Sequence, residues 1–493
     1  MAARGVRHAL PSAISNAPYA TTWDPPRGLT ASGEVDIPSH TDWHPNFSTV
    51  RTRRSSEHAS AMRGPAMISR LLQLSMAWLC LLAQTSWAQQ TLTARVVDAT
   101  SRQPIAGATV VGAGAIVHSA PDGSFALPLA APTGDGASVP LSLKAVGFAR
   151  VETSLRAGDA NNVVAMSRLR PKAVYLSVYG VANRTLRDAA LGLPGRTAIN
   201  ALVIDVKGDR GMTSYRSLAR ERIGAQAYAP PRTPRIENFA AWLKSLHAHG
   251  IYLIARIVVF KDDPLAQAHP EWAVRDAQGD VWQDREHLRW LDPMLPAVWA
   301  HNLDVAEEAA RLGFDEIQFD YLRFPDAPGL RFASPNTEPQ RVAAITGFLS
   351  AANARLAPYN VYTSADIFGY VCWNLNDTML GQQLETLPPL VDYISPMLYP
   401  SGFTWGLPGC RAPIEHPGEI VSRTLAQAVD RTGLPGIRFR PWLQAFRDYA
   451  FDRRPFGATE IRAQIDASEA AQTDGWMLWN PRNQYDPATL PRQ

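Results

Sequence analysis

The sequence is poor in cysteine, in lysine and in long apolar runs. Among its 493 residues are three cysteines, and only five of the 48 basic residues are lysines. So few cysteines exclude a small disulfide-stapled scaffold. A formal net charge of +3 gives no support for a nucleic-acid partner. The apolar fraction of 46%, with 19% charged residues, is ordinary for globular proteins and excludes global disorder.

Motifs of several common enzyme classes are also missing. The chain has no G-x-x-x-x-G-K-[ST] loop for phosphate binding and no G-x-S-x-G nucleophile elbow. It has no H-E-x-x-H motif, and His247 and His249 lie two residues apart at a helix end, where they cannot share a metal on one face. We therefore expect neither a metal nor a cofactor.

The first 88 residues have features of protein processing. Residues 1–66 show no helical or alternating apolar period. Residues 67–88 have a short basic start, a short apolar run and a small-x-small end, which is the pattern of a secretory signal peptide. The run is shorter than the roughly 20 apolar residues of a membrane span. We expect an over-extended or disordered start, a cleaved signal and an exported protein (periplasmic or extracellular) with no stable membrane span. The alternative is a disordered cytoplasmic tail before an uncleaved anchor.

Short alternating strands and turns begin at Thr91. We expect strands near 92–97, 108–111, 125–127, 139–146 and 151–155, at the spacing of a β-sandwich. The pattern Val97-Asp98, Pro104-Ile-Ala-Gly107 and Asp122-Gly-Ser-Phe125 resembles the carboxypeptidase regulatory-like domain. That resemblance implies a small N-terminal sandwich over residues 89–169, with a structural or spacer role.

After Pro171 the chain alternates apolar strand-like runs with amphipathic stretches. Eight strands are expected, near 173–179, 201–206, 251–259, 316–320, 361–367, 393–398, 437–444 and 475–479. Helical spacing of apolar residues predicts helices between them, for example over 340–356, 419–431 and 458–472. This pattern favours a (β/α)8 TIM barrel over residues 172–487. A doubly wound sheet is the alternative, but the first turn has no glycine-rich fingerprint.

In such a barrel the active site lies at the carboxyl ends of the strands. The polar and aromatic residues there are Asp205, Lys207, Arg256, Asp320, Arg323, Asp366, Tyr399, Trp442, Gln444, Trp479 and Asn480. Asp320 and Asp366 end consecutive strands and are the predicted catalytic pair, since glycoside hydrolysis uses two carboxyl groups. The others are predicted to bind substrate, the aromatic residues by stacking on sugar rings. Alternatively, one aspartate only pairs with Arg256 or Arg323, and Asp205 pairs with Lys207.

Several motifs along 172–487 are similar to those of a bacterial family of "putative glycosyl hydrolase" domains related to amylase-like barrels. They are Asp205-Val-Lys-Gly-Asp209, His269-Pro-Glu-Trp272, Trp290-Leu-Asp-Pro293, Phe319-Asp-Tyr-Leu-Arg-Phe-Pro325, Ser364-Ala-Asp-Ile-Phe-Gly369, Asp392–Ser401, Arg440–Gln444 and Gly475–Asn480. The resemblance implies a nucleophile on the fourth strand and an acid on the fifth, where Asp320 and Asp366 fall. The chain departs from amylase-like barrels in having Asp instead of Glu on the fifth strand. It also has Gln444 where many retaining barrels have a carboxylate.

Together these observations predict a secreted glycoside hydrolase that acts on a polysaccharide or oligosaccharide. The alternative is a non-catalytic polysaccharide-binding barrel of the cell envelope. Cys80 lies in the predicted signal peptide, whereas Cys372 and Cys410 follow the fifth and sixth strands. In an oxidising compartment these two residues form either one disulfide or two free thiols. The sequence predicts no oligomeric state.

Overall fold

The computed structural model describes residues 90–129, 134, 136–230 and 235–492. The expected signal peptide and residues 1–66 lie outside this part of the chain. Among the described residues, no helix combines the length and the hydropathy that a membrane crossing requires.

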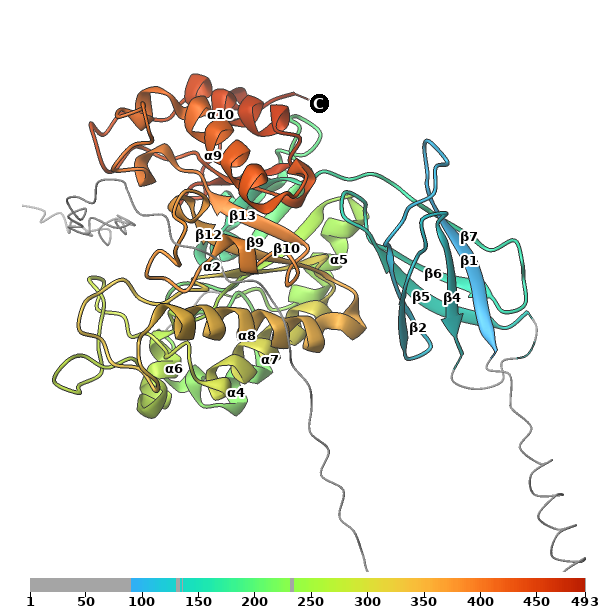
Figure 1. Cartoon of the computed structure of the whole chain (residues 1–493), viewed down its shortest axis with the longest axis horizontal. Coiled ribbons are helices and arrows are strands. Elements are labelled where there is room, and N and C mark those ends of the chain that lie inside the picture. The colour runs from blue at the N-terminus through green and yellow to red at the C-terminus, as the bar shows by residue number, and fades with distance from the viewer. Residues whose placement is uncertain (1–89, 130–133, 135, 231–234, 493) are drawn as a thin grey trace, which may run out of the picture. The chain divides into compact units, whose positions relative to one another are not determined.

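Residues 91–166 form seven strands in two sheets. The strands are β1 (Thr91–Asp98), β2 (Thr109–Gly112), β3 (Ala115–His118), β4 (Ser124–Pro128), β5 (Ser138–Lys144), β6 (Val151–Arg156) and β7 (Val163–Met166). One sheet has the order β4-β1-β7 and the other β3-β2-β5-β6 (Figure 1). Alternation along β1 turns Leu92 and Val96 into a core shared with Val110 and Leu143 of the second sheet. The expected sandwich is confirmed, with β3 and β7 as strands that the sequence pattern did not predict.

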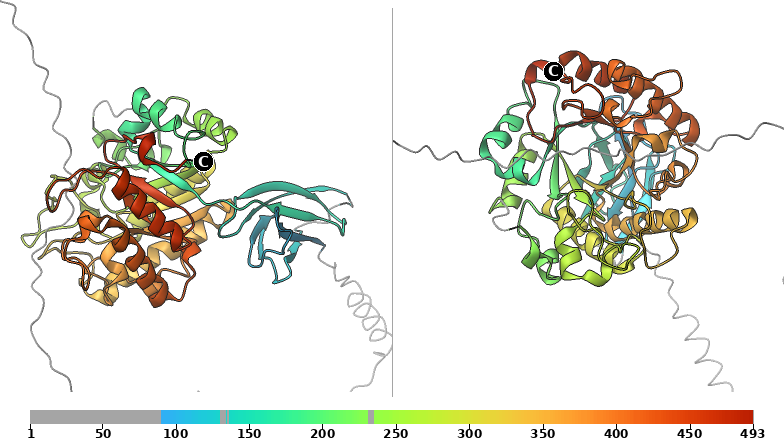
Figure 2. Two further views of the ribbon diagram at one scale, coloured as in Figure 1. Left: turned by 90° about the horizontal axis from the view of Figure 1, so that it is seen from above. Right: turned by 90° about the vertical axis from the view of Figure 1, so that its left-hand side faces the viewer.

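Residues 172–479 contain eight parallel strands that close into a barrel. They are β8 (Lys172–Leu176), β9 (Ala201–Lys207), β10 (Tyr252–Val258), β11 (Glu316–Asp320), β12 (Tyr362–Phe368), β13 (Tyr393–Met397), β14 (Trp442–Gln444) and β15 (Trp476–Trp479). Their order around the barrel is the order of the chain, and β15 pairs with β8 to close it. The right-hand view of Figure 2 shows helices surrounding the strands. The expected (β/α)8 barrel is therefore confirmed.

Helices cover the outside of the barrel. They are α2 (Val178–Ala182), α3 (Arg184–Leu191), α4 (Leu218–Arg222), α5 (Phe239–Ala248), α6 (Asp263–Ala268), α7 (Pro296–Leu312), α8 (Glu338–Leu356), α9 (Pro417–Thr432) and α10 (Ala458–Ala470). In α7 the buried residues Val298, Val305 and Ala309 recur at helical spacing, and Gly313 ends the helix with a positive φ of 99°. Between β12 and β13, where every residue is described, short 3-10 turns replace the helix.

Two barrel strands differ from their predicted ranges by three residues or more at one end, each for a local reason. The first ends at Leu176, because the Ser177 hydroxyl accepts a hydrogen bond from the Gly180 N–H and caps α2. This places Tyr179 in a helix. Strand β14 begins only at Trp442, after a 3-10 turn at Gly436–Arg438 and after Pro441, which has no N–H to give to a neighbouring strand.

The amino-terminal end of the barrel is closed by charged and aromatic side chains. Arg440 is fully buried and pairs with Glu316 and with Asp474, the latter at 2.8 Å. Near this end, the Tyr362 hydroxyl donates to the carbonyls of Ala145 and Phe148 from the sandwich region. The carboxyl ends of the strands are left for the candidate site.

Candidate active site

Asp320 lies at the carboxyl end of β11, beside Arg256 of β10. The guanidinium Nη2 lies 2.6 Å from Oδ2 of Asp320, and Nε donates to the same oxygen at 2.8 Å. The Tyr321 N–H donates to Oδ1 at 2.6 Å. Of the two arginines that the sequence offered as partners, Arg256 is the one that pairs with Asp320. Charge-assisted hydrogen bonds of this kind stabilise a carboxylate.

Asp366 lies on β12, the next strand of the barrel. Phe319 of β11 pairs with Ala365 of β12, so Asp320 and Asp366 each follow that pair by one residue. Oδ1 of Asp366 accepts a hydrogen bond from Nε1 of Trp442 at 2.9 Å, whereas Oδ2 is buried with no partner in the described structure. Burial and the nearby charge of Asp320 raise the pKa of Asp366 well above its ordinary value. The environment thus favours a protonated Asp366.

Asp205 of β9 completes a row of alternating charges. Its Oδ1 lies 2.6 Å from Nη1 of Arg256, and its Oδ2 accepts a hydrogen bond from the Tyr175 hydroxyl at 2.6 Å. Burial raises the pKa of Asp205, and the Arg256 guanidinium opposes that rise. Arg256 therefore holds Asp205 and Asp320 at once.

Aromatic rings line the same end of the lumen. Trp479 stacks on Tyr175 with ring centroids 3.9 Å apart, and the Arg256 guanidinium lies 4.8 Å from the Trp479 ring. Burial raises the pKa of Tyr399, and the charges of Asp320 and Asp366 raise it further, so this phenol lies near the pair. Asp205, Arg256, Asp320, Asp366, Tyr399, Trp442 and Trp479 are thus brought together.

A second group of side chains lies on the loops next to Asp320. The Lys261 ammonium is buried, 3.0 Å from Asp284 and 2.7 Å from Glu286, and lies 5.4 Å from the centre of the Tyr321 ring. Tyr321 has a positive φ of 48°, an uncommon conformation for a bulky residue and one that clusters at functional sites.

Arg323 belongs to this second group. Its guanidinium lies 4.8 Å from the Trp290 ring and 5.2 Å from the Tyr321 ring, and burial lowers its pKa to about 10. Asp209 is partly exposed, and its charge contributes to the raised pKa values of Asp205 and Tyr321. Sequence reasoning gave no role to Tyr175, Asp209, Lys261 or Tyr321. The alternation of Ala173 and Tyr175 along the first strand was the available signal for Tyr175.

Lys207 was predicted to bind substrate or to pair with Asp205, and the structure corrects both expectations. Its ammonium is fully buried, 2.9 Å from Asp262 and 2.7 Å from Oδ1 of Asn302. Asp262 also binds Arg220. Burial lowers the pKa of Lys207 to about 8, against the opposing charge of Asp262. Lys207 thus links β9 to Asp262 before α6 and to Asn302 of α7, outside the lumen.

Three other predicted substrate-binding residues have their polar groups occupied by the protein. The Gln444 amide bonds to the backbone and hydroxyl of Ser401 and to the carbonyl of Phe446. The Asn480 amide bonds to Ala445, Gln484 and Arg482. Trp442 is buried below the mouth and offers no open face for stacking. Gln444 and Asn480 therefore hold loops of the barrel in place, and Trp442 orients Asp366 through its indole N–H.

Of the two alternatives for Cys372 and Cys410, the structure has two free, buried thiols. Burial raises the pKa of Cys372 to about 12, which makes this thiol a poor nucleophile at neutral pH. Among the described residues, no three His, Cys, Asp or Glu side chains are gathered in a way that could hold a metal ion.

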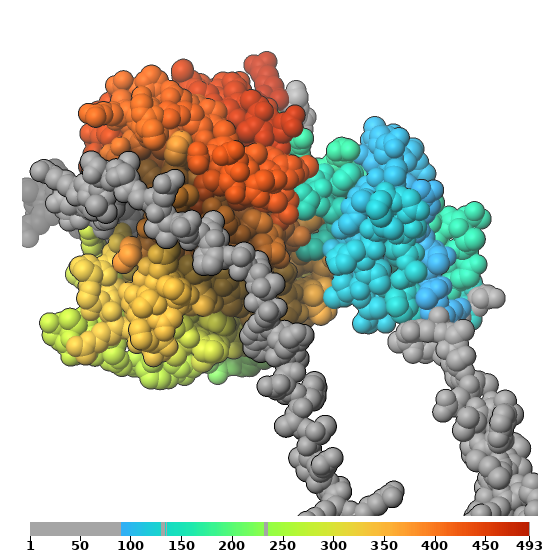
Figure 3. Space-filling model, in the orientation of Figure 1, coloured from blue at the N-terminus to red at the C-terminus, as the bar shows by residue number. Residues whose placement is uncertain are grey.

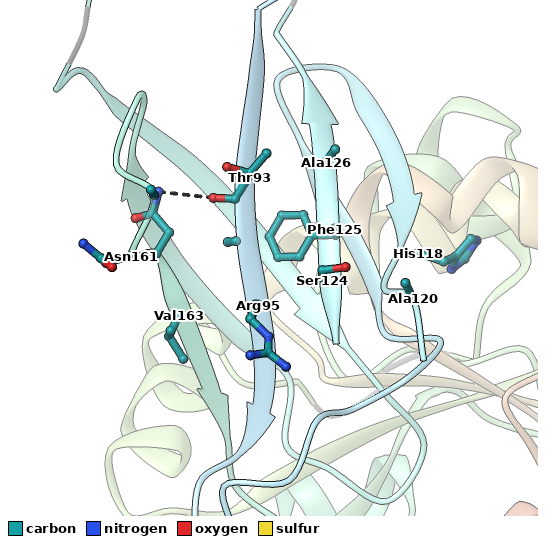
Figure 4. A pocket seen from close by; sticks show the side chains of 12 residues that line it. Thr93, Arg95, His118, Ala120, Ser124, Phe125, Ala126, Asn161 and Val163 are labelled. Atoms are coloured by element: carbon teal, nitrogen blue, oxygen red, sulfur yellow. Dashed lines mark hydrogen bonds between the residues drawn. The ribbon is translucent and has the colours of Figure 1, made fainter. Parts of the chain in front are cut away.

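The sandwich has a hollow of its own, of about 790 Å³, over the outer face of β1, β4 and β7 (Figure 4). Its lining includes Thr93, Arg95, His118, Ser124 and Asn161. No carboxylate lines this hollow, so it lacks the pair of acids that the barrel has.

In Figure 3 the barrel surface recedes between the segments coloured yellow and orange.

Comparison with known protein families identifies the barrel region. A family model described as "Putative glycosyl hydrolase domain" matches residues 173–485, more than half of the chain. The chain belongs to this family. The barrel is therefore a glycosyl hydrolase domain, and the match covers every strand from β9 to β15 and nearly all of β8. No curated protein matches the chain.

Solved structures similar to this glycosyl hydrolase domain come from several bacteria. A hypothetical protein from Ruminiclostridium thermocellum ATCC 27405 is 37% identical over 39% of this chain and 96% of its own, with a TM-score of 0.34. The PgaB (BpsB) glycoside hydrolase domain from Bordetella bronchiseptica is 17% identical over 63% and 94%, with a TM-score of 0.44. The glycoside hydrolase domain of a PelA variant from Pseudomonas aeruginosa is 12% identical over 64% and 96%, with a TM-score of 0.37.

Proposed function

We propose that the barrel hydrolyses glycosidic bonds of a polysaccharide or oligosaccharide with Asp320 and Asp366 as its two carboxyl groups. Asp320 acts as the nucleophile or as the carboxylate that stabilises the oxocarbenium-like transition state. Asp366 acts as general acid and then as general base. This reaction needs one carboxylate and one protonated carboxyl at the same site.

The observation that carries the proposal is the contrast between the two environments. Arg256 donates a hydrogen bond to Asp320 and forms an ion pair with it, whereas Oδ2 of Asp366 is buried without a partner in the described part of the chain. The raised pKa of Asp366 keeps a proton available for the departing glycosidic oxygen. Because Asp366 has almost no exposed surface, that oxygen must enter the lumen beside Asp320 to receive the proton.

The strand register favours retention of configuration. Asp320 and Asp366 are at the same level on neighbouring strands, which lie about 4.8 Å apart in a sheet. Retaining enzymes have carboxyl groups about 5–5.5 Å apart, whereas inverting enzymes need more room for a water molecule. This strand spacing is compatible with such a separation, and we propose that the pair retains the configuration.

The remaining expectations concern the rest of the chain. The apolar run at 71–83 supports export to the periplasm or the cell exterior. The turn pattern of residues 91–169 supports a carboxypeptidase regulatory-like sandwich that serves as a structural or spacer module.

Asparagine substitution at each catalytic position tests the proposal. Asp320→Asn and Asp366→Asn keep the shape of the side chain but remove the nucleophile or the acid. Each should lower kcat/KM for the cleaved glycan at least about 100-fold. Reducing-end release from a panel of polysaccharides measures this, with Asp430→Asn, an exposed carboxylate on α9, as the matched control.

Two results would contradict the proposal. The first is turnover by Asp320→Asn and Asp366→Asn equal to that of the control variant. The second is a wild-type protein that binds a glycan of the panel and releases no reducing ends from it. The second result would favour the non-catalytic polysaccharide-binding barrel.

A further inference from the structure

Large exposed apolar side chains of the barrel gather on the segments that follow its strands. Within the described residues from 172 onward they are Tyr179, Leu218, Tyr228, Leu375, Met379, Trp405 and Phe451. All seven lie in segments that follow barrel strands β8, β9, β12, β13 and β14. Of these, Trp405 follows β13, the neighbour of the strand that carries Asp366, and a large exposed apolar group so placed marks a binding surface.

A chain of ring contacts leads outward from the catalytic pair. Tyr399, beside Asp320 and Asp366, packs edge-on against Phe446 with ring centroids 5.4 Å apart. Phe446 lies nearly parallel to Tyr449, at 8° and 6.0 Å. All three rings are partly exposed. They come from the loops after β13 and β14, so two neighbouring strands supply this side of the mouth.

A second pair of aromatic residues, Tyr370 and Trp405, lies on the loops after β12 and β13. The Tyr370 hydroxyl accepts a hydrogen bond from the Trp405 N–H at 2.9 Å and donates to the carbonyl of Gly406 at 3.1 Å. These bonds fix the backbone that carries Trp405. The Trp405 side chain itself is 63% exposed. A large indole side chain that an ordered loop exposes to solvent can stack on a ligand.

One polar group of this surface has no partner. The Tyr449 hydroxyl is buried and makes no hydrogen bond within the described structure. It lies close to the backbone of Gly402, where an added Cβ would be 3.5 Å from the hydroxyl oxygen. A buried hydroxyl without a partner costs stability, and a ligand hydroxyl at this position would recover that cost.

We propose that Tyr399, Phe446, Tyr449, Tyr370 and Trp405 form a set of glycan subsites, which we name the aromatic strip. The proposal rests on the proposed function and deepens it: the substrate is a polymer, several of whose sugar units lie along the strip. Continuity with Asp320 and Asp366 selects a glycan as the occupant. Aromatic planes bury the apolar faces of sugar rings, and phenol hydroxyls match the sugar hydroxyls at the ring edges.

The first test compares Trp405→Ala with Tyr228→Ala, both in the Asp320→Asn background so that no substrate is consumed. Tyr228 is 49% exposed and follows β9, which lies opposite β13 in the barrel order. Native gels that contain starch, dextran, xylan, hydroxyethyl cellulose or glycol chitin measure retardation by each polymer. Trp405→Ala should weaken the retarding polymer's binding about tenfold, the loss of one stacked ring, and Tyr228→Ala should not.

The second test uses Tyr449→Phe, which removes only the unpartnered hydroxyl. Binding of the same polymer should weaken several-fold, while the urea midpoint should stay the same or rise, because no internal hydrogen bond is lost. A hydroxyl with a structural role would lower the urea midpoint and leave polymer binding unchanged.

The outcomes separate the strip from the catalytic proposal. Retardation by none of the polymers, or equal losses for Trp405→Ala and Tyr228→Ala, overturns the strip whatever the activity of the catalytic variants. Loss of dimers on gel filtration of Trp405→Ala, with polymer binding unchanged, would show that the strip contacts a second copy of the chain. Unchanged hydrolysis by Asp320→Asn would overturn the catalytic pair even if Trp405→Ala weakens binding.

Discussion

At the scale of single residues, the chemistry of the site depends on how differently two identical side chains are surrounded. Asp320 receives hydrogen bonds from Arg256 and the Tyr321 backbone. Asp366 receives one from Trp442 and is otherwise enclosed. Both are aspartates on neighbouring strands, so the division of roles comes from burial and charge alone.

Because the pKa of Asp366 is raised in the folded protein, the contribution of this group to the free energy of unfolding should fall as pH increases. The unfolded chain loses this proton near pH 4, whereas the folded chain keeps it up to the raised pKa. Folding therefore takes up a proton in this window, and the free energy of unfolding falls as pH rises through it. Asp366→Asn cannot titrate, so its stability relative to wild type should increase from pH 4.5 to pH 7. Urea unfolding at both pH values measures this, and a constant difference would contradict it.

Individual site residues were predictable from position but not from orientation. The strand-end rule correctly placed Asp320, Asp366 and Arg256 close to one another in the barrel. It failed for Lys207, because a side chain at a strand end can turn into the lumen or into the helix layer, and Lys207 turns to Asp262. It also failed for Gln444, whose amide is taken up by Ser401 of the neighbouring segment. These partners lie far away in the sequence, so no local sequence pattern predicts them.

At the scale of elements, one glycine is critical for closing the barrel. Gly475 has a φ of +77°, and an added Cβ would lie 1.9 Å from the carbonyl oxygen of Pro171. That oxygen accepts a hydrogen bond from the Trp476 N–H at 3.0 Å, just before β15 pairs with β8. A side chain at position 475 would thus push apart the last and first strands.

Gly475→Ala should therefore cost far more stability than alanine at a glycine with a similar backbone and free space. Gly433 ends α9 with a φ of +67° and has no atom within 4 Å of an added Cβ. We expect Gly433→Ala to cost about 1 kcal/mol from its backbone alone, and Gly475→Ala to cost about 3 kcal/mol or more from backbone and clash together. Urea unfolding of both variants measures the difference, and equal costs would refute the steric argument.

Strands and helices of the barrel were predictable because their periods differ and each is strongly apolar. Strand β12 and helices α8 and α9 differ from the expected ranges by only one or two residues at each end. The short strands β3 and β7 were not predicted. The 3-10 turns within residues 369–392 were not predicted either, because the apolar residues of this segment follow no helical spacing.

At the scale of the whole molecule, the two ends of the barrel differ in the side chains that fill them. Fully buried ion pairs of Arg440 with Glu316 and Asp474 fill the amino-terminal end. The carboxyl end holds Asp320 and Asp366, the proposed catalytic pair, and the rings of the proposed aromatic strip. We therefore infer that the strands position the two carboxyl groups and that the loops after them bind the substrate.

The pH dependence of kcat/KM tests the central claim, the pairing of Asp320 with a protonated Asp366, most directly. The account predicts that wild-type activity on the cleaved glycan persists well above the ordinary aspartate pKa of about 3.9 and then falls along an alkaline limb, as Asp366 loses its proton. The residual activity of Asp366→Asn should lack this limb. An alkaline limb that remains in Asp366→Asn, or wild-type activity that already falls near pH 4, would contradict the account.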